Sequence, residues 1–219
     1  MQSGRFADRT EAGRMLAQAL KDYAFRENLL VLALPRGGVP VAFEVACALG
    51  APLDVFVVRK LGVPGQEEYA MGAIAAGVRV LSQEVVRALG ISGAAVDAVV
   101  AKEAQELARR EQLYRAGRPP LDVRGKEVIL VDDGLATGAT MEAALHALRA
   151  QQPARLVAAV PVAPPATCER LRPLVDELVA VLMPDPFHAV GLWYSEFPQT
   201  SDDEVRDLLA RAPRTPAAC

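Results

Sequence analysis

The chain has few aromatic residues, few cysteines and no excess of positive charge. Aromatic residues make up 5% of its 219 residues, so we expect an aliphatic core. Its three cysteines, Cys47, Cys168 and Cys219, lie far apart, which argues against a disulfide framework or a zinc site. A net charge of -3 gives no basic surface for nucleic acid. We therefore expect reduced thiols and a small-molecule ligand.

Several other signals are missing as well. The polar first ten residues contain no signal-peptide core, and no apolar run approaches the length of about 20 residues that spans a membrane. No G-x-G-x-x-G follows an apolar run, and no Gly-Lys-Ser/Thr closes a glycine-rich loop, so dinucleotide and P-loop nucleotide sites are disfavoured. We expect a cytoplasmic protein with no membrane or nucleic-acid partner and a single domain over residues 1–219.

Hydrophobic spacing predicts helices that alternate with strands. This alternation is typical of an α/β fold with a mostly parallel, twisted sheet flanked by helices, whose ligands lie beyond the carboxyl ends of the strands. Two short segments, 72–75 and 78–81, are expected to pair as further strands. The strands of the main sheet are predicted at 29–34, 53–58, 128–131, 155–162 and 177–182, and helices at 8–27, 39–49, 141–148, 165–171 and 201–210.

Three segments interrupt this alternation. Residues 59–71 are polar and contain two glycines and a proline, which predicts a long exposed loop. Residues 82–120 predict a helical insertion of two helices, and the charges on the second helix, including Lys102 and Arg110, indicate a solvated face. Residues 183–200 are irregular. We expect these segments to form a small hood and insertion lobe beside the main sheet.

The strongest chemical signal lies at residues 128–140. Four apolar residues predict a buried strand, the segment after Thr140 has helical spacing, and the loop between them is rich in small residues and hydroxyls. The free amides and dipole of the helix N-terminus attract phosphate there. Asp132 and Asp133, at the end of the strand, are expected to accept hydrogen bonds from sugar hydroxyls. The segment therefore predicts a sugar-phosphate site.

This segment resembles the PRPP-binding motif of type I phosphoribosyltransferases, in which a hydrophobic strand, two acids and a Thr-Gly-x-Thr loop follow one another. The resemblance implies that Asp132 and Asp133 hold the ribose 2- and 3-hydroxyls. A generic strand-turn-helix with solvated acids is the alternative. The resemblance also implies that the 5-phosphate binds the loop formed by Leu135, Ala136, Thr137, Gly138, Ala139 and Thr140.

A second loop with a predicted role is Pro35-Arg36-Gly37-Gly38, which also joins a strand to a helix. Its glycines expose backbone amides, and Arg36 can form bidentate contacts with a polyphosphate. Its position resembles that of the family's pyrophosphate loop, although a plain turn is the alternative. The resemblance implies a non-proline cis peptide between Pro35 and Arg36.

The resemblance also places a mobile lid over PRPP at residues 59–71. Arg59 and Lys60 are then expected to meet pyrophosphate, with an ordinary charged strand end as the alternative. Glu67 and Glu68 are candidate acid/base groups, although solvated loop carboxylates are the more typical reading of such a segment.

Aromatic residues gather at residues 184–194, a segment that resembles the base-binding hood of 6-oxopurine phosphoribosyltransferases. Phe187 and Trp193 are therefore candidates for stacking on a base, with an aromatic plug in the core as the alternative. Ala136 departs from the 6-oxopurine enzymes, which have an acid at this position. Either another group moves the proton or the acceptor is not a 6-oxopurine.

Together these features predict a Mg²⁺-dependent phosphoribosyltransferase of nucleotide metabolism. It would transfer 5-phosphoribosyl from PRPP to a small nitrogen nucleophile, expected to be a nucleobase, and release pyrophosphate. Magnesium would be held through PRPP rather than directly by the protein. A homo-oligomer is compatible with this prediction. Two alternatives stay open: a PRPP-binding regulatory protein without turnover, and a related domain that uses a ribose phosphate in another reaction.

Overall fold

A five-stranded parallel β-sheet forms the centre of the structure, a computed structural model that describes residues 4–75 and 77–214 without the side chain of Glu68. All neighbouring strands are parallel, in the order β2-β1-β6-β7-β8. The predicted parallel α/β fold is therefore confirmed. The strands are β1 (Leu29–Ala33), β2 (Leu53–Val55), β6 (Glu127–Val131), β7 (Arg155–Val162) and β8 (Glu177–Leu182).

Helices cover both faces of this sheet. One buried cluster joins the sheet to α1, α2 and α7, and a second joins its other face to α5 and α6. Coverage of both faces explains why β1 is apolar at every position. The helices are α1 (Arg9–Ala19), α2 (Gly38–Leu49), α5 (Ala139–Ala150), α6 (Pro165–Leu171) and α7 (Asp202–Arg211), with short 3-10 turns at Lys21–Tyr23, Arg172–Leu174 and Val190–Trp193.

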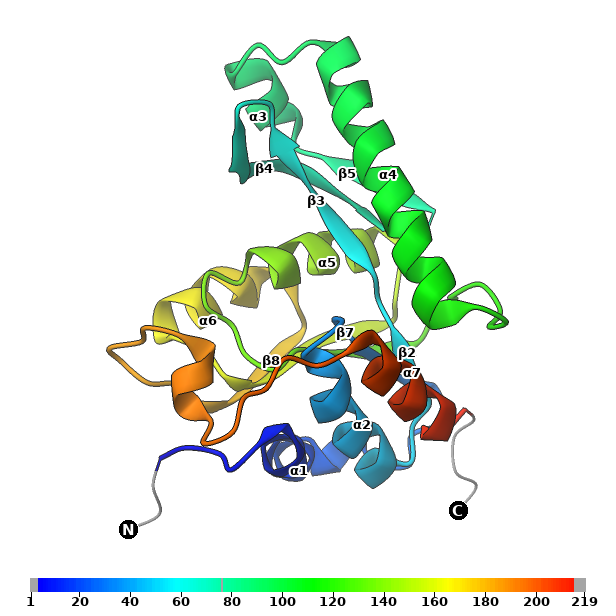
Figure 1. The fold of residues 1–219 in the computed structure, drawn as a ribbon, viewed down its shortest axis with the longest axis vertical. Helices are drawn as coiled ribbons and strands as arrows, with labels where there is room; N and C mark the ends of the chain where they lie inside the picture. Colours follow the sequence, from blue (N-terminus) through cyan, green and yellow to red (C-terminus); the bar gives the residue numbers. More distant parts are fainter. Residues whose placement is uncertain (1–3, 76, 215–219) are drawn as a thin grey trace.

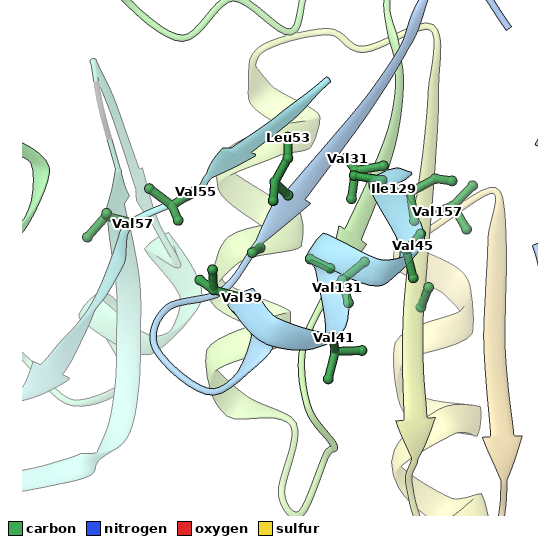
Figure 2. Close-up of a cluster of buried hydrophobic side chains, with 14 of the residues drawn as sticks. Val31, Val39, Val41, Val45, Leu53, Val55, Val57, Ile129, Val131 and Val157 are labelled. Atoms are coloured by element: carbon green, nitrogen blue, oxygen red, sulfur yellow. The ribbon is translucent and has the colours of Figure 1, made fainter. Parts of the chain in front are cut away.

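Alternate side chains of the strands supply the two clusters. Val31, Ile129 and Val157 lie side by side on β1, β6 and β7 and pack with Val45 of α2 (Figure 2). The residues one position further along each strand pack with α5 and α6 instead. Full burial of such a side chain contributes about 1.5–3 kcal/mol, so aliphatic residues alone can hold the layers together.

The predicted long loop at residues 59–71 is wrong. These residues belong to an antiparallel hairpin of β3 (Val58–Val63) and β4 (Gln66–Ala75), to which β5 (Val78–Leu81) adds a third strand. The apparent loop signals have other roles. Gly65, with φ 78°, forms the turn, and Gly62 lies at a register shift where a Cβ would be 2.6 Å from the Glu67 carbonyl oxygen. The strand predicted at 53–58 likewise divides between β2 and β3.

Helices α3 (Gln83–Ala88) and α4 (Gly93–Arg115) follow this hairpin, which confirms both predicted helices. Ser82 and Ser92 cap them by accepting hydrogen bonds from the amides of Val85 and Ala95. We call residues 58–75 and 77–115 the second lobe; in Figure 1 it extends away from the main sheet. Whether residues 82–120 are a separate insertion stays a prediction.

Residues 183–200, the hood segment, contain no helix or strand longer than the turn at Val190–Trp193. Phe6 forms an isolated parallel bridge with Tyr194 of this segment. Within the ranges 4–75 and 77–214, none of the helices combines the length and apolarity needed to span a membrane.

Candidate active site

Asp132 and Asp133 follow β6 directly and lie at the carboxyl end of the parallel sheet. The carboxylate of Asp132 accepts a hydrogen bond of 2.9 Å from the Asp133 amide. Burial raises the pKa of Asp132 well above its ordinary value, and the charge of Asp133 raises it further. The fold therefore places two mutually repelling carboxylates where ligands of parallel α/β proteins bind.

Arg9, which sequence reasoning missed, pairs with the second of these acids. Its Nε and Nη2 atoms lie 2.9 and 2.8 Å from Asp133 Oδ2. The guanidinium also donates to the carbonyl of Pro198 at 2.6 Å and lies 3.8 Å from the centre of the Phe197 ring. Burial raises the pKa of Asp133, and Arg9 opposes that rise. Arg9 thus joins the hood segment to the acid pair.

The loop after the acids is held open toward solvent. Gly138 adopts the left-handed conformation with φ 67° immediately before α5, and Ala136, Thr137 and Thr140 are exposed. Helix α6 supports the loop from behind, because the Thr167 hydroxyl donates to the Ala136 carbonyl at 2.8 Å. Backbone amides of the first turn of α5 and exposed hydroxyls are suitable donors to a phosphate.

The Pro35–Gly38 loop contacts the acid pair directly, because β1 and β6 are neighbours in the sheet. A Cβ on Gly37 would be 2.0 Å from Asp133 Oδ2, and one on Gly38 would be 2.8 Å from the Val131 carbonyl oxygen. Both positions therefore need glycine. The peptide between Pro35 and Arg36 is cis, as expected. The two predicted ligand-binding loops thus form one surface.

On one side of this surface a hollow of about 450 Å³ lies against the hood segment. Arg36 lines it, and its Nη1 atom is 3.8 Å from Asp202 Oδ1 at the start of α7. The hollow is also lined by Arg9, Gly37, Asp133, Val190, Phe197, Pro198, Gln199 and Thr200.

On the other side, a cleft of about 490 Å³ lies between the predicted ligand-binding loops and the second lobe. Pro35 and Thr140 line it together with Arg59, Lys60 and Glu67. Three of the predicted side chains of residues 59–71 are therefore close to the loops, although they lie on a hairpin. The side chain of Glu68 lies outside the described part of the structure.

The two aromatic residues that are predicted to stack on a base contact each other in the structure. Phe187 and Trp193 stack on each other, with ring centres 6.4 Å apart, and pack against the buried cluster of Phe6 and Tyr194. The indole Nε1 of Trp193 is buried and has no hydrogen-bond acceptor among the described residues. Tyr194 is the hood residue that reaches the acids, because its hydroxyl donates to the Asp133 carbonyl at 2.5 Å. Base binding by Phe187 and Trp193 stays a prediction.

Comparison with known proteins indicates the family of the chain. A profile of the phosphoribosyl transferase domain matches residues 7–186, which include both loops and the acid pair. The chain belongs to the phosphoribosyltransferase family. It is 51% identical over 210 residues to provisionally named phosphoribosyl transferases from two strains of Mycobacterium tuberculosis. Those names state no acceptor.

The chain spans about half the length of these curated relatives, 95% of it matching 47% of theirs. The crystal structure of TT1426 from Thermus thermophilus is similar over nearly its whole length. It is 44% identical, with a TM-score of 0.86, and the match covers 94% of this chain and 97% of that one. The type I phosphoribosyltransferase resemblance seen in the sequence is therefore confirmed at the level of family and fold.

Proposed function

We propose that the protein transfers the 5-phosphoribosyl group of PRPP to a nitrogen nucleophile, a nucleobase or similar molecule, and releases pyrophosphate. The observation that carries this proposal is the direct contact between the Gly37 backbone and the Asp133 carboxylate. One ligand that bears ribose hydroxyls beside a pyrophosphate would contact both groups at once. PRPP has that arrangement around its C1 atom.

In this proposal each loop holds one part of PRPP. Asp132 and Asp133 accept the ribose hydroxyls, and charge-assisted bonds of this kind contribute about 1.5–3 kcal/mol each. Residues 135–140 donate amides and hydroxyls to the 5-phosphate. Residues 36–38 bind the pyrophosphate, assisted by Arg59 and Lys60 from the cleft.

The donor atoms of the site fit magnesium that arrives with the substrate. Among residues 4–75 and 77–214, no group of three or more acid, histidine or cysteine side chains could hold a metal. The two carboxylates at the site are assigned to the ribose hydroxyls, and Mg²⁺, which binds substrate phosphates and keeps several waters, would be held through PRPP. Mg²⁺ would neutralise charge on the departing pyrophosphate, while Asp132 and Asp133 orient the ribose.

The transfer breaks the bond between ribose C1 and the pyrophosphate oxygen and forms a bond from C1 to the acceptor nitrogen. Pyrophosphate keeps the electron pair, so C1 gains positive character, as in other glycosyl transfers. The acceptor must lose its nitrogen-bound proton. Because Ala136 carries no acid, we assign this proton to Glu67, which lines the cleft, or to its neighbour Glu68.

The acceptor itself is proposed to stack on the hood near Phe187 and Trp193, and the activity would belong to nucleotide metabolism in the cytoplasm. Pyrophosphate release should be followed with PRPP, Mg²⁺ and a panel of bases. Release that depends on one base supports the transferase. PRPP binding without release for any base would favour a regulatory protein, and release without a base would favour another reaction of the ribose phosphate.

A further inference from the structure

Helix α4 presents charged side chains to the cleft beside the ligand-binding loops. Lys102, Glu103 and Arg110 line this cleft together with Val99, and Pro35 and Thr140 line the same cleft. Positions 99, 102, 103 and 110 recur at helical spacing, so they share one face of α4. The sequence predicted that this face is solvated, but the fold turns part of it toward the predicted phosphate site.

Ion pairs fix the geometry of this face. Nη2 of Arg59 on β3 lies 2.7 Å from Glu103 Oε2, and Nε of Arg110 lies 2.8 Å from Glu106 Oε1. The Arg59 pair ties α4 to β3 across the cleft. Lys102, the residue before Glu103, forms neither a hydrogen bond nor an ion pair with any part of the chain that the structure describes. Its ammonium group is available to a ligand.

The charge of the cleft favours an anion. Its lining includes four cationic side chains and two carboxylates, namely Arg59, Lys60, Lys102 and Arg110 against Glu67 and Glu103. Lysine is a mobile point charge on a long stem and binds phosphate without requiring a fixed geometry. A polyphosphate that extends from the Pro35–Gly38 loop into the cleft would reach Lys102, whose ammonium group is not engaged by the described residues.

We propose that Lys102 binds the pyrophosphate end of PRPP, and that α4 is therefore part of the substrate site. This inference rests on the proposed function and deepens it, because it assigns a substrate contact to the second lobe. It also gives the lobe a role in selectivity: ligands with a pyrophosphate should gain affinity from α4, whereas ribose 5-phosphate should not.

The test is calorimetry of the Lys102→Gln protein with three ligands in the presence of Mg²⁺: PRPP, inorganic pyrophosphate and ribose 5-phosphate. We expect affinity for PRPP and pyrophosphate to fall about tenfold. This is the low end of the loss expected when a hydrogen bond to a charged group is removed, because Lys102 is exposed to solvent. Affinity for ribose 5-phosphate should stay within about twofold, the level of an uninvolved surface change. Lys102→Arg should retain most of the affinity, and Lys21→Gln, an exposed change in the turn after α1, is the matched control.

The outcomes separate this inference from the proposed function. If Lys102→Gln binds PRPP and pyrophosphate as tightly as the parent, or loses ribose 5-phosphate affinity equally, the role of Lys102 is overturned. If the parent binds pyrophosphate but not PRPP, the proposed function is overturned, while the pyrophosphate series still decides the role of Lys102. Unchanged thermal unfolding of the variant would exclude a folding defect.

Discussion

The two acids at the end of β6 should respond differently to removal of their charge. The Asp133 amide donates a hydrogen bond of 2.9 Å to the Asp132 carboxylate. In Asp132→Asn, the side-chain carbonyl oxygen can still accept this bond. Burial and the Asp133 charge raise the pKa of Asp132, so its ionised form costs folding free energy at neutral pH. We therefore expect Asp132→Asn to be more stable than the parent protein at neutral pH, with a higher unfolding midpoint.

Asp133→Asn removes the partner of Arg9, whose side chain is only 11% exposed. Burial of the Asp133 charge also costs folding free energy, which the substitution relieves. The Arg9 guanidinium, however, then loses its contacts of 2.9 and 2.8 Å with the Asp133 carboxylate. We expect Asp133→Asn to be less stable than Asp132→Asn by about 1.5–3 kcal/mol, the contribution of a hydrogen bond to a charged group. Both variants should nevertheless weaken PRPP binding, by about 10- to 150-fold.

Urea unfolding at about pH 7 and near pH 4, combined with PRPP calorimetry, measures these effects. The pKa of Asp132 is higher in the folded than in the unfolded protein, so ionisation of Asp132 destabilises the fold. This destabilisation begins as the pH rises through the unfolded-state pKa and is complete above the folded-state pKa. The advantage of Asp132→Asn should therefore shrink in acid. Asp22→Asn, at an exposed site in the turn after α1, should change neither stability nor binding. Lower stability of Asp132→Asn at neutral pH, or unchanged PRPP affinity in both variants, would refute the reasoning.

Three further predictions concern the loops and the hairpin. Gly37→Ala should reduce PRPP affinity at least about tenfold, since its Cβ would be 2.0 Å from a carboxylate oxygen of the acid pair. Gly93→Ala, whose Cβ would lie in open space, should leave PRPP affinity unchanged. Equal affinities of the two variants would contradict the contact between Gly37 and the acid pair. Hydrogen exchange of residues 64–70, at the tip of the hairpin, should slow when PRPP and Mg²⁺ bind, and unchanged exchange would remove hairpin closure from the mechanism. Gln at Glu67 or Glu68 should lower turnover about 10²- to 10⁴-fold with PRPP affinity nearly intact, and parental turnover in both variants would assign the proton elsewhere.

The sheet, its helices and the acid pair could be predicted because their signals are local. Burial on both faces leaves a run of apolar residues such as 128–131, and a helix start leaves a capping residue such as Ser82 or Ser92. The contact between the two predicted ligand-binding loops also follows from the sequence, once parallel strands are expected to end at one edge.

The features that the sequence did not reveal depend on contacts between distant parts of the chain. Arg9 meets Asp133 across 124 positions, and nothing around Arg9 distinguishes it from any other residue that opens a helix. The sequence of the hairpin resembles that of a loop because Gly62 and Gly65 suggest a break in secondary structure. In the fold, Gly62 permits the close approach of the two strands, and Gly65 forms the turn between them. The direction in which Lys102 faces likewise depends on where the second lobe packs.

The most direct test of the central claim is a crystal structure of the protein with PRPP and Mg²⁺. We expect the ribose 2- and 3-hydroxyl oxygens at hydrogen-bond distance, about 2.5–3.0 Å, from the carboxylates of Asp132 and Asp133. The 5-phosphate should lie against residues 135–140 and the pyrophosphate against residues 36–38. A bound PRPP whose ribose does not touch the acid pair, or whose two phosphate ends occupy the opposite loops, would contradict the assignment.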